Sequence, residues 1–285
     1  MKFLKSLIFL TACTVSLNAM GGAAESDRLA SVLAAQPEEN QARFAHRHPQ
    51  ETLEFFEIEP GMTVMEALPG SGWYTRILLP YLGSEGHVIG ADYSMDMYPL
   101  FGFFNEEWLA EHATWTTDFP ASAAEWAGED GAGITAFVFG SLPEEMMETA
   151  DAVLLIRALH NLARFEGDGG FLSAALTDAH DVLKPGGIVG VVQHEARADM
   201  PDDWAGGANG YLKRDFVIAK MKEFGFEFVG SSDINRNEKD QPTDSDIVWR
   251  LPPSLATSRE NPELRAELEA VGESNRMTLK FRKPE

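Results

Sequence analysis

Only one cysteine, Cys13, occurs among the 285 residues of the chain, so a disulfide within the chain is excluded. Without cross-links, stability has to come from a packed interior, and a hydrophobic content of 44% is enough to build one. Long apolar runs are also missing, because no stretch approaches the ~18 to 20 consecutive apolar residues of a membrane-spanning helix. These absences favour one large globular domain.

Positive charge is scarce as well. The chain has 23 lysine and arginine residues against 45 aspartate and glutamate residues, which gives a formal net charge of -22. Such a surplus repels phosphate backbones and anionic lipid surfaces at long range, so we expect no nucleic acid partner and favour a small-molecule substrate. We interpret the acidic residues as a solvated surface that keeps the protein soluble.

The N-terminus has the pattern of an export signal. Lys2 and Lys5 precede a mostly apolar stretch, residues 7–15, and small residues follow before position 25. This pattern predicts a secretory signal peptide over residues 1–24 and a periplasmic mature domain. The four residues that end at Cys13, Leu-Thr-Ala-Cys, also fit a bacterial lipobox, so a lipid anchor at Cys13 and soluble release both stay open.

The remaining residues, 25–285, predict a single α/β domain. A helical preface is expected over residues 26–57, and strand-like and helix-like segments then alternate, which is typical of a doubly wound, mostly parallel sheet. The expected strands are residues 63–68, 87–91, 134–139, 152–156, 188–193, 226–231 and 277–281. Helices are expected at residues 73–82, 171–183, 216–224 and 262–271, with an irregular excursion before residue 133.

A glycine loop follows the first expected strand. Glu66 lies on that strand, Gly70 and Gly72 form the loop, and a second acid, Asp92, ends the next strand. Such a loop lets backbone approach a ligand, and an acid at the second strand's tip is typical of ribose binding. A nicotinamide-binding loop would have a third glycine, which is missing here, so hydride transfer is disfavoured. The alternative is a plain turn between strand and helix.

Two histidines are candidate proton acceptors. His160, followed by Asn161, is expected at the end of the fourth strand, and His194 at the end of the fifth. Both would face the crevice in which such folds bind ligands, where a neutral imidazole can accept a proton. Tyr211 follows a glycine-rich segment and is a candidate lid over the substrate. Each of these residues has a structural alternative, a buried histidine or a packed loop aromatic.

Two other clusters do not predict a site. His46 and His48 lie two residues apart, but no third ligand is apparent, so no metal is expected. The aromatic residues between positions 101 and 108 are interpreted as core or lid packing, because the acidic charge argues against a base-stacking surface.

The glycine loop, Asp92 and the segment Val-Leu-Lys-Pro-Gly-Gly-Ile-Val at residues 182–189 resemble the signatures of class I S-adenosylmethionine-dependent methyltransferases. Residues 69–75, 157–161 and 277–281 are similar to those of exported predicted methyltransferases of Gram-negative bacteria. The resemblance covers about residues 43–284. It implies a Rossmann-like, seven-stranded sheet whose last strand is antiparallel.

The resemblance also implies roles for individual residues. Residues Glu66, Gly70 and Gly72 would hold the methionine end of S-adenosylmethionine, Asp92 its ribose and Ser141 its adenine. Facing the substrate, His160 and His194 would be the catalytic residues, and Asn161 and Tyr211 would contact the substrate. One departure from the family pattern is Leu68, which occupies the place of the first glycine and narrows the cofactor space.

The function implied is methyl transfer from S-adenosylmethionine to a small molecule or an envelope component, by in-line attack. The alternative is a non-catalytic periplasmic binding protein that keeps the fold, since one scaffold hosts many functions. The oligomeric state is left open.

Overall fold

The computed structural model describes residues 25–285. The expected export signal, residues 1–24, and the alternative lipid anchor at Cys13 lie outside the described residues. No helix in the described part is both long and apolar enough to cross a bilayer.

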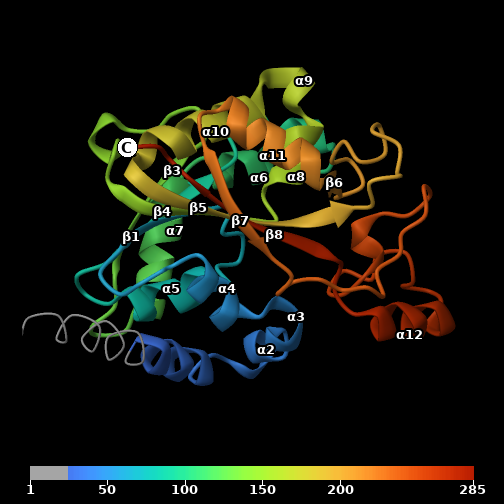
Figure 1. Cartoon of the computed structure of the whole chain (residues 1–285), viewed down its shortest axis with the longest axis horizontal. Helices are drawn as coiled ribbons and strands as arrows, with labels where there is room; N and C mark the ends of the chain where they lie inside the picture. Colours follow the sequence, from blue (N-terminus) through green and yellow to red (C-terminus); the bar gives the residue numbers. More distant parts are fainter. Residues whose placement is uncertain (1–24) are drawn as a thin grey trace, which may run out of the picture.

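An eight-stranded sheet runs through the middle of the protein (Figure 1). Its main path has the order β3-β2-β1-β4-β5-β8-β7, in which the first five strands are parallel and β8 is antiparallel to both neighbours. Because the strand order reverses between β1 and β4, the carboxyl ends of these strands border a crevice. The strands are β1 Thr63–Ala67, β2 His87–Asp92, β3 Gly133–Val138, β4 Ala150–Ile156, β5 Leu183–Ala196, β6 Leu212–Lys213, β7 Glu227–Ser232 and β8 Arg276–Arg282.

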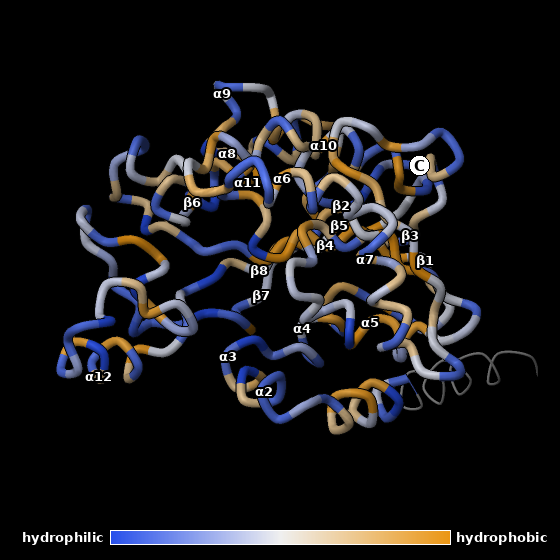
Figure 2. Tube along the Cα trace, turned by 180° about the vertical axis from the view of Figure 1, so that it is seen from behind, coloured by the Kyte–Doolittle hydropathy of each residue, from blue (hydrophilic) through white to orange (hydrophobic). Residues whose placement is uncertain are grey.

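Helices cover both faces of the sheet (Figure 1). One apolar cluster includes α8, α10 and α11, and the other includes α4, α5 and α7 on the opposite face. Figure 2 shows hydrophobic segments along the central strands and hydrophilic ones at the periphery. The central strands are apolar on both sides because each side is buried under a helical layer.

The helical elements fill the connections between strands. A helix at residues 25–34 begins the described chain. The others are α2 Glu38–Gln41, α3 Phe44–Arg47, α4 Pro49–Phe55, α5 Thr75–Leu82, η1 Tyr98–Phe101, α6 Glu106–His112, α7 Trp115–Ala123, η2 Ala124–Trp126, η3 Glu144–Met146, α8 Leu159–Arg164, α9 Glu166–Gly169, α10 Phe171–Val182, α11 Arg214–Glu223, η4 Val248–Arg250 and α12 Pro262–Val271.

This architecture confirms the predicted doubly wound fold, with three differences. The short strand β6 pairs with β5 and brings the sheet to eight strands instead of seven. The turn expected at residues 184–187 is a bulge inside β5, because Gly186 and Gly187 exchange hydrogen bonds with Lys283 beyond β8. Finally, His160 lies on α8 and not at the end of β4, since the chain turns at Arg157, whose φ is 57°.

Candidate functional site

A buried acid on β1 precedes a loop whose backbone is partly left-handed. Glu66 is buried, and its Oε2 accepts a hydrogen bond of 2.6 Å from the Thr75 hydroxyl. Burial raises the pKa of Glu66 to about 7. Leu68 and Gly70 have φ values of 52° and 58°, so Leu68 keeps the conformation that a glycine would adopt there without strain. Leu68 thus combines a left-handed backbone with a side chain that lines the cavity at this loop.

Gly72 is required for packing. A Cβ at this position would lie 2.2 Å from the Trp126 ring, so any other residue would require that ring to move. The same ring stacks under the Arg76 guanidinium, whose Cζ lies 3.6 Å from the ring centroid. The expected contact of Gly72 with a cofactor stays a prediction, since the glycine faces the tryptophan.

Three groups of the chain already contact the carboxylate of Asp92 at the tip of β2. The Tyr93 amide donates to Oδ1 at 2.8 Å, and the Tyr98 hydroxyl donates to Oδ2 at 2.7 Å. His112 Nε2 lies 2.8 Å from the same Oδ2. Burial, followed by the negative charge of Asp92, raises the pKa of Tyr98 above its usual value, so the phenol stays a donor. Sugar hydroxyls would have to use Oδ1 or displace one of the Oδ2 partners.

A cavity of about 390 Å³ lies at the carboxyl ends of the parallel strands, lined by Leu68 and Gly70 of the loop after β1. One wall, called the β2 side below, consists of Asp92, Tyr93, Tyr98, Trp108, His112 and Trp115. A second wall, called the β4 side, consists of Ile156, Arg157, His160, His194 and Trp249. The structure thus brings Gly70, Asp92, His160 and His194 to one cavity, as expected from the sequence.

The two histidines of the β4 side face each other, with ring centroids 5.4 Å apart. Nδ1 of His160 lies 3.4 Å from Gln193 Oε1, and Nδ1 of His194 lies 2.5 Å from Ser274 Oγ. Burial lowers the pKa of His160 to about 4. Burial, followed by the charge of His160, also lowers the pKa of His194 well below its ordinary value. Both rings are therefore neutral at pH 7, and neither Nε2 has a hydrogen-bond partner among the described residues.

Ser141 and Asn161 do not line this cavity. Ser141 is exposed, and its hydroxyl donates to the Val138 carbonyl at 2.7 Å, which closes its own turn. The Asn161 amide donates to the Tyr93 hydroxyl at 3.0 Å, so it supports the wall of the cavity from behind. Its Oδ1 is buried without a partner.

Tyr211 is fully buried and does not form a lid in this structure. Its hydroxyl donates to Asp240 Oδ2 at 3.0 Å, and its ring stacks on Trp204 with centroids 5.1 Å apart. Asp240 also forms a buried ion pair with Arg250 at 2.7 Å. Tyr211 is therefore one part of a buried network that joins the segments after β5 and β7.

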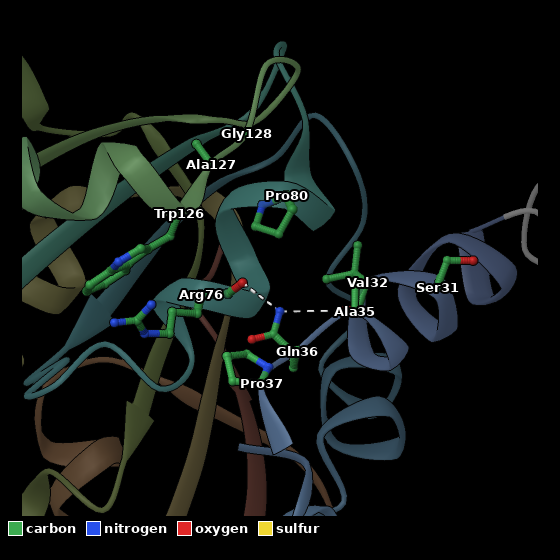
Figure 3. Close-up of a pocket in the computed structure, with 10 residues that line it drawn as sticks. All are labelled: Ser31, Val32, Ala35, Gln36, Pro37, Arg76, Pro80, Trp126, Ala127 and Gly128. Carbon is green, nitrogen blue, oxygen red and sulfur yellow. Dashed lines mark hydrogen bonds between the residues drawn. The ribbon is translucent and has the colours of Figure 1, made fainter. Parts of the chain in front are cut away.

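A second cavity, of about 450 Å³, lies between the helix at residues 25–34 and α5 (Figure 3). Its walls are mainly apolar, and the Gln36 amide that faces it already donates to the Arg76 carbonyl at 3.0 Å. None of the residues predicted to bind cofactor or substrate lines it. Ligand sites combine an apolar wall with convergent polar groups, and the cavity at the strand tips has both.

Several residues of the β2 and β4 sides were not anticipated from the sequence. Tyr98 and His112 come from the excursion between β2 and β3, where no periodic pattern indicates which side chains point inward. Arg157 was part of the motif at residues 157–161, but nothing in the sequence predicted its place in the cavity. Trp249 arrives from η4, far along the chain.

Comparisons with known proteins identify the fold. No family model and no curated protein matches the chain. Among solved structures, the [4+2]-cyclase SpnF is similar with a TM-score of 0.54 and 16% identity, over 93% of this chain and 96% of that one. A chain from the complex of the Haloferax volcanii Trm112 methyltransferase activator with a proposed methyltransferase is similar with a TM-score of 0.50 and 16% identity, over 90% and 98% of the two chains.

A SAM dependent methyltransferase from Aquifex aeolicus is also similar, with a TM-score of 0.48 and 12% identity, over 90% of this chain and 98% of that one. Together with the strand order described above, the similarities to SpnF and to the chain from the Haloferax volcanii complex show that the chain has the Rossmann-like fold of class I S-adenosylmethionine-dependent methyltransferases.

Proposed function

We propose that the protein is an S-adenosylmethionine-dependent methyltransferase that methylates an oxygen or nitrogen atom of a small-molecule acceptor. The proposal depends on one observation, the cavity in which the Gly70 loop and Asp92 face His160 and His194. Export, which the N-terminal pattern predicts, would place the acceptor outside the cytoplasm, among small molecules or envelope components.

The loop and the β2 side fit a nucleoside. Asp92 Oδ1 has capacity for a further hydrogen bond beside the one from the Tyr93 amide, and ribose hydroxyls are suitable donors. At Gly70 the nearest atom to an added Cβ is the Leu68 carbonyl oxygen at 4.0 Å, so the backbone is open to a ligand. Tyr93 and Trp115 supply aromatic surface for a base. The cavity volume of about 390 Å³ lies within the range of small-molecule sites.

The β4 side fits the acceptor. S-adenosylmethionine supplies an electrophilic methyl group when bound, and an acceptor hydroxyl or amine gives up a proton as it gains the methyl carbon. A neutral imidazole nitrogen directed at the cavity can take that proton. Nε2 of His160 and Nε2 of His194 are the candidates for this role, because both residues line the cavity and their Nδ1 atoms contact Gln193 and Ser274. The same side chains fix the ring orientations.

Calorimetry with S-adenosylhomocysteine, the demethylated product of the cofactor, tests the proposal. We expect binding of one molecule per chain with a dissociation constant of about 1 to 100 µM, which corresponds to a favourable binding free energy of roughly 5 to 8 kcal/mol. Fluorescence titration with reduced nicotinamide dinucleotide is the control, and we expect no change in that experiment. Absence of detectable S-adenosylhomocysteine binding at millimolar ligand would rule out the enzyme and leave the non-catalytic binding protein.

A further inference from the structure

Arg157 occupies a particular place between two cavities. It directly follows the last residue of β4, has the left-handed backbone noted above, and its amide donates to the Val192 carbonyl at 2.6 Å. It lines the main cavity together with His194 and Trp249, and the same three residues line a smaller neighbouring cavity of about 110 Å³. A strained, non-glycine backbone at a cavity wall is a recurrent feature of binding sites.

The other arginines near Arg157 share one acid. Arg47 Nε lies 3.2 Å from Glu273 Oε1, and Arg276 Nη1 lies 3.2 Å from Glu273 Oε2. Arg43 also binds the carboxylate, through Nε at 2.8 Å. Burial raises the pKa of Glu273, but these guanidinium groups outweigh it and hold the pKa below its usual value, so the acid stays charged.

Arg157 has no such partner. Within residues 25–285, its guanidinium forms no ion pair and no hydrogen bond. Arg276 and Arg43 are close enough to repel it, and Glu273 is close enough to attract it without contacting it. Burial, followed by the charge of Arg276, lowers the pKa of Arg157 to about 10, so the group is still cationic at pH 7. A half-buried, unpaired cation is costly, and an anion that enters the cavity removes that cost.

We propose that Arg157 binds the carboxylate of the acceptor substrate, so that the acceptors are small carboxylic acids. This inference rests on the proposed function. A planar guanidinium matches a planar carboxylate with two parallel hydrogen bonds.

The position of Arg157 favours the acceptor over the cofactor as the source of the carboxylate. Asp92, the expected ribose ligand, ends β2, whereas Arg157 follows β4, and β1 lies between the two strands. Arg157 lines the cavity together with His160 and His194, the candidate proton acceptors for the acceptor substrate.

Benzoate and its neutral analogue benzamide are suitable probes, read by intrinsic tryptophan fluorescence because Trp249 lines both cavities. We expect the native protein saturated with S-adenosylhomocysteine to bind benzoate at least about tenfold more tightly than benzamide. Arg157→Gln should weaken benzoate binding about tenfold and leave benzamide unchanged. Arg164→Gln is the matched control, since it removes the same charge from an exposed position on α8 and should change benzoate binding less than about twofold.

Arg157→Gly is a second variant that tolerates the left-handed backbone and removes the guanidinium, and it should match the glutamine variant. Equal benzoate binding by native protein and both variants would overturn the proposal. Tighter, Arg157-dependent binding of inorganic phosphate than of benzoate would overturn the choice of carboxylate.

Two further ligands show whether Arg157 binds a carboxylate of the cofactor or a carboxylate of the acceptor. The first outcome is that Arg157→Gln weakens the binding of S-adenosylhomocysteine tenfold but not the binding of methylthioadenosine, which lacks the carboxylate, and that benzoate competes with S-adenosylhomocysteine. In that case Arg157 binds the carboxylate of the cofactor, and the acceptor assignment is wrong. If S-adenosylhomocysteine does not bind at all while benzoate binding still depends on Arg157, the methyltransferase proposal fails and the carboxylate site is supported.

Discussion

The two walls of the cavity differ in how far their polar groups are already satisfied. On the β2 side, Asp92 accepts from the Tyr93 amide and Tyr98 and contacts His112. On the β4 side, the Arg157 guanidinium and the Nε2 atoms of the histidines have no protein partners among the described residues. A ligand on the β2 side must therefore exchange hydrogen bonds, whereas a ligand on the β4 side adds new ones.

Burial also shifts the pKa values of two groups in opposite directions. Burial raises the pKa of Glu66, on β1, to about 7, and it lowers the pKa of His160, on the β4 side, to about 4. Both groups are thereby shifted toward neutrality.

The largest expected effect is an opposite response to pH of His160, on the β4 side, and Glu66, on β1. His160 has a folded pKa of about 4, below its unfolded value, so the unfolded state binds more protons and stability falls as the pH drops from about 6.5 to 4. Glu66 has a folded pKa of about 7, above its unfolded value, so it adds stability at low pH that is lost as the pH rises from about 4.5 to 7. Each contribution is about 3 kcal/mol.

Urea unfolding at several pH values between 4.5 and 7.5 separates these contributions. His160→Asn should make the loss of stability on acidification smaller, and Glu66→Gln should make it larger while stabilising the protein above pH 7. The two variants are controls for each other, because general damage to the core would lower both curves without changing their slopes. Parallel curves for the native protein and both variants would contradict the pKa assignments.

The second effect concerns the cofactor. Asp92→Ala should weaken S-adenosylhomocysteine binding about 100-fold, because it removes a charged acceptor for the ribose hydroxyls. His160→Ala, on the other wall, should change this affinity less than about threefold. Tyr98→Phe is the matched control, since it removes one donor to Asp92 and keeps the carboxylate, and it should maintain or improve binding. Equal losses for the Asp92 and His160 variants in calorimetry would argue against the nucleoside position.

Most of the fold could be predicted from the sequence because strand and helix patterns alternate. The sheet's central strands are continuous apolar runs, and α12 has the expected bounds, with Asn261 as its N-terminal cap. The short strand β6 could not be anticipated, since a two-residue strand has no periodicity and exists through its pairing with β5. The bulge in β5 likewise depends on the chain after β8.

The candidate site was predictable where a motif fixed the backbone and less so elsewhere. The sequence pattern located the strand ends near Gly70, Asp92 and His194, and all three residues line the cavity. The position of Ser141 near the tip of β3 was also expected, but its hydroxyl is used by its own turn. Tyr211 is buried because Asp240, 29 residues away, accepts its hydroxyl hydrogen bond, and no local signal indicates such a partner.

The smallest expected effect belongs to Leu68, which lies between the two walls. Replacing it with glycine removes the strain of a left-handed leucine backbone, which stabilises the folded state by about 1 kcal/mol. The loss of a partly buried side chain and the greater chain entropy of glycine in the unfolded state destabilise the protein by a similar amount. The free energy of unfolding should therefore change by less than about 1 kcal/mol. Affinity for S-adenosylhomocysteine should rise roughly three- to tenfold, because the side chain that narrows the cavity is removed.

Leu68→Ala distinguishes space from strain. Alanine also widens the cavity, yet it keeps a Cβ in the left-handed region, so it should bind the ligand as tightly as the glycine variant while being less stable by about 1 kcal/mol. Calorimetry and urea unfolding on the same samples measure both quantities. If both variants fold and neither binds more tightly, Leu68 does not limit the cofactor space, and the exchange of hydrogen bonds at Asp92 is the remaining barrier on the β2 side.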